Sequence, residues 1–460
     1  MPLRKKFGHA VKALFSVLIL ALQTGAFAYV LFGTYNRVFK APLATGGDLL
    51  VAIYLVILIV TFNILDALKI GYHTRSNIIL SQSISVLIVN FVAYLQISLI
   101  HRAFVSVLPM LILTLINVCI SVLWTFSASA VINKIFPPKK VILVYGDHQA
   151  QDLIYKLVSR TDQYLICESV LLKPDTELFD GNLEEVYEAI KRYEAVVISR
   201  VPSKERNDIL KFCYVNNIDV YLPPRISDIF IRGAEEIHQF DSPLLFCRNT
   251  GLTEEQRIIK RACDIFLSII GIIVFSPLLA IISLSIKLED RGPVLFKQKR
   301  ITINEKVFEI YKFRSMIVDA EKNGEVIPTT DRDPRITKVG RVIRKLRLDE
   351  LPQLFNILKG DMSVVGPRPE RVEHHEMYTK QVPEFKYRTK VKAGLTGFAQ
   401  IMGKYNTTPY DKLVLDLMYI NNFTFFLDFK LILQTIKVMF MKESTEGFEE
   451  KKKKETEIND

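Results

Sequence analysis

The sequence predicts a membrane protein with four consecutive parts. They are a bundle of four membrane-spanning α-helices over 1–136, an α/β Rossmann-like domain over 137–250, a mainly α, mixed α/β domain over 251–441 with a re-entrant membrane helix at 262–289, and a disordered tail over 442–460. Two observations predict this class. Hydrophobic residues make up 49% of the 460 residues, and their excess lies in the first part and in one later run. Between these apolar regions, short buried-type strands alternate with helical segments, which is typical of a parallel sheet.

The first part contains four apolar segments. Each is close to the roughly 20 residues that span a bilayer as a helix. They cover about 13–32, 49–68, 78–100 and 107–132. No small-residue cleavage site follows the first segment, so we interpret it as a retained helix rather than a signal peptide. The basic start of the chain predicts a cytoplasmic N-terminus, and four crossings return the chain to the cytoplasm.

The net charge and the cysteines limit which classes of ligand and which kinds of site we expect. The formal net charge is +11, which suits phosphates, anionic lipid or nucleic acid. The long apolar segments favour a lipid bilayer and phosphates, and no nucleic-acid-binding signature is present. The five cysteines are scattered without a CxxC pair, which argues against a zinc site and against a disulfide framework; they are Cys119, Cys167, Cys213, Cys247 and Cys263.

The second part follows the linker Pro137-Pro138-Lys139-Lys140. We expect strands at 141–145, 195–199 and 219–222 and helices at 149–160 and 204–215. Only Gly146 stands at the first strand-to-helix turn, so the glycine fingerprint of a dinucleotide site is missing. The pattern favours a structural or regulatory module, with cofactor binding as the alternative.

A charge-free run over 265–286 opens the third part, and Ser276-Pro277 interrupts it. Proline removes a backbone hydrogen bond and kinks a helix. In lipid the freed carbonyl needs another donor, which Ser276 could provide. One interpretation is a fifth membrane-spanning helix with a tolerated proline. The other is a broken helix that enters and leaves on the same face. We favour the second, because a fifth crossing would place the acids described next outside the cell.

These acids are Asp349 and Glu350, which follow a basic run. Pro352 fits the first turn of a helix, so we expect that helix to begin near Glu350. Adjacent acids at a helix start can take different roles, and free N–H groups there suit a phosphate. The pattern suggests one carboxylate as nucleophile and one as metal ligand. The alternative is ordinary helix capping.

Several long motifs surround this pair in a fixed order. They include Gly292-Pro293…Arg300, Tyr311-Lys312-Phe313-Arg314-Ser315-Met316, Gly360-Asp361…Gly366-Pro367-Arg368-Pro369 and Lys392-Ala-Gly394-Leu-Thr396-Gly397-Phe-Ala-Gln400. Over about 255–441 they resemble the bacterial sugar transferases, the polyprenol-phosphate phosphoglycosyl transferases. The layout with four spans and a Rossmann-like domain resembles the large members that start exopolysaccharide, capsule or O-antigen synthesis.

The resemblance implies transfer of a sugar-1-phosphate from a UDP-sugar to undecaprenyl phosphate, with release of UMP and with Mg²⁺ as cofactor. It implies Asp349 as the nucleophile that forms an aspartyl-phosphosugar, and Glu350 as a metal ligand together with Asp349. The remaining residues that it assigns have three roles. Lysines and arginines bind the substrate phosphates: Lys312, Arg314, Arg344, Arg368 and Lys404. Asp416 and Asp428 are supporting acids, and Ser276 and Pro277 form the break of the re-entrant helix. Lysine 404 stands where some small relatives carry arginine, so the bidentate fork is lost.

Alternatives remain open for several residues. Lys312 and Arg314 fit one solvated strand face, Arg344 fits an exposed or membrane-facing basic stripe, and Asp428 fits a helix cap. The resemblance implies a multi-pass protein of the bacterial plasma (inner) membrane with a cytoplasmic catalytic domain. A non-enzymatic membrane scaffold or sensor in a polysaccharide export complex is the second hypothesis. The sequence names neither the sugar nor the pathway, and a homo-oligomer stays open.

Overall fold

The computed structural model describes residues 3–37, 46–146, 160–172, 179–239, 241–247, 251–318, 333–403 and 407–441. Within them the chain forms two compact units, 1–223 and 224–460. The predicted helix over 149–160, Lys404 and the tail over 442–460 lie wholly or almost wholly outside the described residues.

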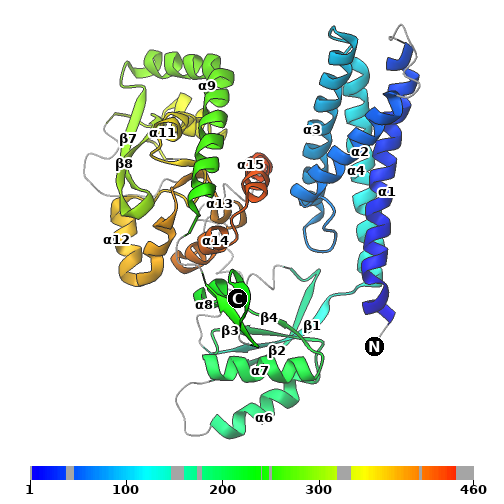
Figure 1. Ribbon diagram of the computed structural model, residues 1–460, viewed down its shortest axis with the longest axis vertical. Helices are drawn as coiled ribbons and strands as arrows, with labels where there is room; N and C mark the ends of the chain where they lie inside the picture. Colours follow the sequence, from blue (N-terminus) through cyan, green and yellow to red (C-terminus); the bar gives the residue numbers. More distant parts are fainter. Residues whose placement is uncertain are drawn as a thin grey trace. The chain divides into compact units, whose positions relative to one another are not determined.

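The first unit begins with four long apolar helices, which confirms the four predicted N-terminal helices (Figure 1). They are α1 (Leu3–Gly33), α2 (Gly46–Ile64), α3 (Arg75–His101) and α4 (Leu108–Ile135), with the short η1 (Tyr35–Arg37) after α1. All four are long and apolar enough to cross a membrane. Their shared core carries polar pairs as well as apolar packing, such as Tyr54 Oη donating to Asn90 Oδ1 at 2.8 Å. Hydrogen bonds of this kind hold membrane helices together, because lipid offers them no other partner.

The same unit continues into a four-stranded parallel sheet with the order β2-β1-β3-β4. Its elements are β1 (Lys139–Tyr145), β2 (Tyr164–Leu171), α6 (Phe179–Ile190), β3 (Ala195–Ser199), α7 (Ser203–Val215) and β4 (Asp219–Tyr221). The three predicted strands and the helix over 204–215 agree with β1, β3, β4 and α7, whereas β2 was not predicted. Alternating side chains of β1 face two separate cores, with Ile142 and Val144 in one and Val141 and Leu143 in the other. This is why the strand is apolar throughout.

The second unit opens with α8 (Ile226–Arg232), the hairpin strands β5 (Glu235–Gln239) and β6 (Ser242–Phe246), and the 37-residue α9 (Glu254–Asp290). Helix α9 is the fifth described helix that is long and apolar enough to cross a membrane. Figure 1 shows it as two arms that meet at a sharp bend, and Pro277 lies inside the helix.

Mixed α/β structure follows α9, as predicted. Its elements are β7 (Leu295–Ile301), η3 (Ile303–Glu305), β8 (Val307–Phe313), α10 (Lys338–Lys345), η4 (Leu348–Glu350), α11 (Gln353–Lys359), β9 (Ser363–Val365), α12 (Val372–Gln381), η5 (Pro383–Lys390), β10 (Gly394–Thr396), α13 (Phe398–Met402), α14 (Pro409–Asn421) and α15 (Phe425–Met439). Strands β7 and β8 form an antiparallel hairpin, and β9 pairs with β10 in parallel.

Two apolar clusters hold α9 against these elements. Ile282 and Ile286 of its second arm pack with Phe313 of β8 and Ile343 of α10. Leu354 and Ile357 of α11 form a neighbouring cluster with Phe308 and Ile310 of β8, against which Ile272 of α9 also packs. The short helices after β8 therefore lie between the hairpin and the membrane-type helix, and η4 with its two acids is part of this layer.

Candidate functional site

The site is built around a buried ion pair between β8 and η4. Lys312 Nζ donates to Glu350 Oε1 at 2.7 Å, with side chains only 18% and 19% exposed. Arg368 Nη2 reaches the same oxygen at 3.5 Å from the segment after β9. Three predicted site residues from distant parts of the sequence therefore meet at one carboxylate. The burial of Lys312 excludes a solvated strand face at this position.

The α-helix that we predicted to begin near Glu350 begins three residues later. Asp349 and Glu350 lie in η4, a single 3₁₀ turn, and α11 begins only at Gln353. Arg347 adopts a left-handed conformation with φ 53°, which ends the path of α10 and turns the chain. Pro352 lies at the N-cap of α11 rather than in its first turn. This local turn, which separates α10 from α11, gives the two acids their different surroundings.

The two neighbouring acids have opposite pKa shifts. Burial by itself raises the pKa of Glu350, but the charges of Lys312 and Arg368 outweigh it and lower that pKa to about 2. Burial, together with the negative charge of Glu350, raises the pKa of Asp349 above its usual range, against the opposing effect of Lys312 and Arg344. Environments that push two carboxyl pKa values apart assign different chemical roles to them. Glu350 is therefore held as an anion, and Asp349 is the more basic of the two carboxylates.

A shallow pocket opens beside this pair. It is lined by Arg300, Ile310, Lys312, Glu350, Gln353, Arg368, Pro369, Gly394, Leu395 and Gln400. Among the described residues, neither Nε of Arg300 nor Nε2 of Gln400 has a hydrogen-bond partner. Buried N–H groups are normally paired, so a pocket with these donors and two further cations suits an anionic ligand. Arg300 and Gln400 belong to the motifs at 292–300 and 392–400, but neither residue was predicted individually as part of the site.

Burial lowers the pKa of Arg300 to about 10, and the nearby positive charges of Arg368 and Arg371 add to this effect. Close cations repel one another, and a bound anion would relieve that repulsion. The electrostatics of the pocket therefore agree with its geometry.

Behind Arg368 lies a buried charge network that the sequence did not reveal. Arg388 of η5 is 4% exposed and Asp416 of α14 is 1% exposed, and the two are joined at 2.7 Å. Arg388 also pairs with Glu370 at 3.3 Å and donates to the backbone oxygen of Arg368 at 3.0 Å. The predicted supporting acid Asp416 thus holds Arg388, which in turn holds the loop of Arg368. Arg388 could not be found from the sequence, because it looks like one of several solvated charges there.

The second supporting acid, Asp428, pairs with Lys260 of α9 and accepts a hydrogen bond from Tyr419 Oη at 2.8 Å. The alternative of a helix cap is wrong at this position. Thr424 caps α15, with its hydroxyl accepting from the N–H of Leu427 at 3.0 Å. Asp428 therefore joins α9 to the C-terminal helices and lies apart from the residues that line the pocket.

The other predicted cations have different surroundings. Arg314 is 6% exposed and pairs with Asp290 at the end of α9, so it is not on a solvated face and does not line the pocket. Arg344 of α10 is half-buried and close enough to Asp349 to lower its pKa.

Pro277 lies inside the continuous helix α9, and the carbonyl that it leaves without a backbone donor has a side-chain partner. Pro277 cannot donate to the carbonyl of Ile273, four residues earlier, and Ser276 Oγ donates to that oxygen at 2.8 Å. The first arm is also fixed to the site layer, since Asp264 accepts from Ser363 Oγ at 3.0 Å and from the N–H of Val364 at 2.9 Å. The bent helix is thus part of the same rigid layer as the pocket.

Asp349 and Glu350 are the acids of this site that could hold a metal. No group of three or more His, Cys, Asp or Glu side chains suited to a metal occurs in the described part of the chain. Mg²⁺ needs only one or two protein carboxylates when substrate phosphates supply further oxygens. Asp349 and Glu350 fit that requirement, because one oxygen of Glu350 carries both cation contacts.

Comparison with known proteins adds to this geometry. The profile of the bacterial sugar transferase family matches residues 255–442, which contain the whole site. The chain is 41% identical over 187 residues to the exopolysaccharide production protein PSS of Rhizobium leguminosarum bv. phaseoli, with 39% of this chain and 94% of that protein covered.

Two longer relatives carry more specific names. A UDP-glucose:undecaprenyl-phosphate glucose-1-phosphate transferase of Klebsiella pneumoniae is 36% identical over 271 residues, covering 57% of this chain and 56% of that protein. A UDP-N-acetylgalactosamine-undecaprenyl-phosphate N-acetylgalactosaminephosphotransferase of Aeromonas hydrophila is 37% identical over 254 residues, covering 54% and 59%. The matched region thus spans somewhat more than half the length of these two relatives.

Proposed function

The chain belongs to the bacterial sugar transferase family, and from this we propose that it transfers a sugar-1-phosphate from a UDP-sugar to undecaprenyl phosphate and releases UMP. The observation that carries the proposal is the pair of adjacent acids with opposite pKa shifts beside a cation-lined pocket. The names of the relatives support the two substrates. The name of the Rhizobium relative supports a part in exopolysaccharide production, and we propose that the chain acts at the first membrane step of exopolysaccharide, capsule or O-antigen synthesis.

In the first step, a carboxylate oxygen of Asp349 attacks the phosphorus that bears the sugar. The bond from that phosphorus to the bridging oxygen breaks, and UMP leaves with this oxygen. The product is an acyl phosphate, an aspartyl-phosphosugar. A carboxylate is a known nucleophile for such intermediates, and the raised pKa of Asp349 makes it the better nucleophile of the pair.

In the second step, a phosphate oxygen of undecaprenyl phosphate attacks the same phosphorus. The bond to Asp349 breaks, its carboxylate is restored, and the lipid diphosphate sugar leaves. No external oxidant or further reactant is needed. Phosphoryl transfer depends mainly on positioning and charge neutralisation.

The cations neutralise charge in both steps. Lys312 and Arg368 hold Glu350 and face the pocket in which the donor diphosphate would lie. Arg344 lowers the pKa of Asp349 and so keeps part of it ionised. When bound to Glu350 and Asp349, Mg²⁺ would supply further neutralisation of the diphosphate charge.

The membrane setting is part of the proposal. Helix α9 re-enters and leaves on one face at the Ser276-Pro277 break, so the site stays on the cytoplasmic side of the bacterial inner membrane. The helices of 1–136 hold the chain in the bilayer, the Rossmann-like domain of 137–250 is structural or regulatory, and 251–441 is the catalytic domain. A bent helix whose freed carbonyl is satisfied by Ser276 supports this arrangement.

The test uses purified full-length protein in nanodiscs with Mg²⁺, undecaprenyl phosphate and a panel of UDP-sugars, and it follows UMP release. We expect release with one or a few sugars, and with D349N a loss of release together with the loss of a radiolabelled protein-phosphosugar adduct. Normal release by D349N would refute the nucleophile. Silence of the folded wild type across the panel would favour the scaffold hypothesis.

A further inference from the structure

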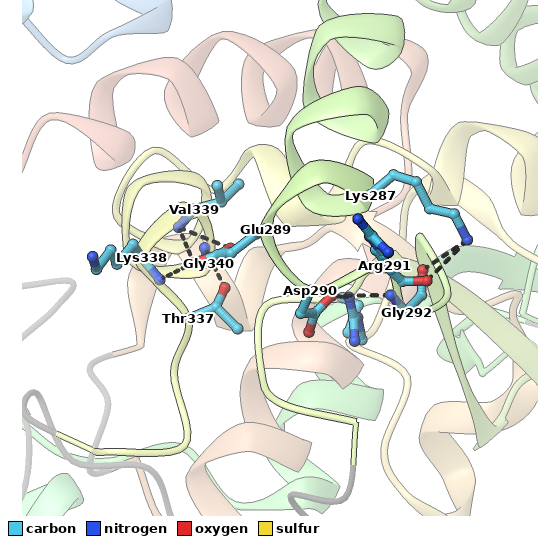
Figure 2. A network of polar contacts seen from close by, with 10 residues as sticks. Lys287, Glu289, Asp290, Arg291, Gly292, Thr337, Lys338, Val339 and Gly340 are labelled. Atoms are coloured by element: carbon cyan, nitrogen blue, oxygen red, sulfur yellow. Dashed lines mark hydrogen bonds and ion pairs between the residues drawn. The ribbon is translucent and has the colours of Figure 1, made fainter.

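The last turn of α9 makes contacts that the chemistry above does not explain. Glu289, near the end of the helix, lies beside the first residues of α10 (Figure 2). One carboxylate oxygen, Oε1, accepts from the backbone N–H of Lys338 at 2.7 Å. The N–H of Val339 lies 3.3 and 3.4 Å from its two oxygens. The side chain of Glu289 at the end of α9 therefore accepts hydrogen bonds at the N-terminus of α10, 49 residues later in the chain.

This contact completes the cap of α10. A helix begins with backbone N–H groups that lack a partner within the helix. Thr337 donates its own N–H to the backbone oxygen of Ser315 at 3.1 Å, and its hydroxyl accepts from the N–H of Gly340 at 2.9 Å. The two remaining donors, at Lys338 and Val339, are those that Glu289 accepts. Its negative charge also suits the positive end of the helix dipole.

Helix α10 cannot shift without moving the acids of the site. Only Leu346 and Arg347 separate it from η4, and Ile343 packs into the same cluster as Leu348 of η4. On its other side, a Cβ added at Gly340 would lie 2.0 Å from the backbone oxygen of Ser315. The start of α10 is thus held between α9 and the segment that leaves β8.

The residue after Glu289 makes a parallel connection. Asp290 accepts from the N–H of Gly292 at 3.1 Å and pairs with Arg314. Arg314 stands two residues after Lys312, so the two share one face of the extended chain. Two consecutive acids at the end of α9 therefore fix both segments that supply the site, one leading to Asp349 and one carrying Lys312.

We propose that Glu289 is a positioning residue for Asp349, acting through α10, so that the second arm of α9 holds the nucleophile in place. The inference rests on the proposed function for its kinetic part only. Glu289 touches none of the residues that line the pocket, and its effect passes through two backbone N–H groups.

The experiment compares E289A and E289Q with E309A in the full-length protein. Glu309 is a matched control, because it is an exposed acid that pairs with Lys297 at 3.4 Å and lies away from α10. Hydrogen–deuterium exchange is read over 338–346 and over 348–350. Loss of a helix cap corresponds to roughly 2-fold to 30-fold faster exchange. We expect this in both segments for E289A, less for E289Q because its amide oxygen still accepts, and no change for E309A.

UMP release supplies the second readout. We expect E289A to lower kcat with KM for the UDP-sugar unchanged, and E289Q to recover part of the rate. Exchange in E289A that equals E309A would overturn the proposal, as would faster exchange with an unchanged kcat. If the wild type releases no UMP, the proposed function fails. The inference is then tested by hydrogen exchange only. Faster exchange over 348–350 in E289A would support it, and faster exchange confined to 338–346 would overturn it.

Discussion

Arg388 provides the sharpest test of how the site is supported. We consider R388M, which keeps the length and apolar stem of the side chain and removes the guanidinium. Asp416, 1% exposed, then loses both of its contacts to Arg388, at 2.7 and 2.9 Å. Glu370 retains Lys412 at 3.3 Å. Removal of one partner of a buried ion pair costs about 3–5 kcal/mol, because the remaining charge stays buried without compensation.

The assay is native-state hydrogen exchange of α14 and η5 in the full-length protein in detergent. Exchange reports the free energy of local opening, and this method does not require the whole membrane protein to unfold in one step. A loss of about 3–5 kcal/mol corresponds to exchange that is roughly 150-fold to 5,000-fold faster. The matched control is K297M, which removes a cation from an exposed pair and should change the free energy by less than about 1 kcal/mol.

The double variant R388M/D416L separates stability from function. Replacement of both charges with apolar side chains should recover most of the free energy of unfolding, since no unpaired charge remains at Asp416. UMP release should stay low, because the hydrogen bond from Arg388 to the backbone of Arg368 is still absent.

The pH dependence gives a further check. Burial raises the pKa of Asp416, and without Arg388 the neutral form becomes easier to reach. The stability deficit of R388M should therefore be smaller at pH 5 than at pH 8. A deficit below about 1 kcal/mol, or one that grows as the pH falls, would refute this account of the network.

Two further predictions concern the nucleophile and the bent helix. The pKa of Asp349 is raised, so on acidification the single-turnover rate of UMP release should begin to fall at a pH where an ordinary aspartate is still ionised. Arg344 lowers this pKa, so R344M should shift the acidic limb of the pH–rate profile to higher pH. An acidic limb at the same pH in R344M would exclude Arg344 as an electrostatic partner of Asp349. In P277A the restored N–H can donate to the carbonyl of Ile273, so the helix should straighten. In a background without the native cysteines, K297C should then become reactive to an impermeant thiol reagent from outside the cell, whereas reactivity in the unaltered helix would contradict the re-entrant arrangement.

The sequence alone determined the local features of this protein. Four apolar segments of membrane-spanning length predicted α1–α4, because the bilayer thickness sets that length whatever the helices pack against. The strands over 141–145 and 195–199 were predicted for a similar reason, since a strand that is buried on both faces is apolar throughout. Ser276 and Pro277 indicated a carbonyl without a backbone donor and a hydroxyl that could bind it, because the carbonyl that a proline leaves free lies four residues earlier in the same helix.

In the candidate site, too, the sequence predicted individual residues, whereas their arrangement depends on the tertiary structure. The family resemblance of the motifs predicted Lys312, Asp349, Glu350 and Arg368 as site residues, but the contacts of Lys312 and Arg368 with Glu350 depend on the packing of β8, η4 and the segment after β9. The predicted helix start near Glu350 was wrong, because Arg347 adopts the left-handed conformation and the chain turns before α11 begins at Gln353.

Only the tertiary structure decided which charged side chains and polar groups come together. Arg388, Glu289 and Arg300 look like ordinary solvated charges in the sequence, and their roles come from partners that lie far away along the chain. Electrostatic interactions depend on distance and on local dielectric, neither of which a sequence pattern records. Periodicity along the chain determines the elements, whereas the pairing of buried charges is fixed only when those elements pack.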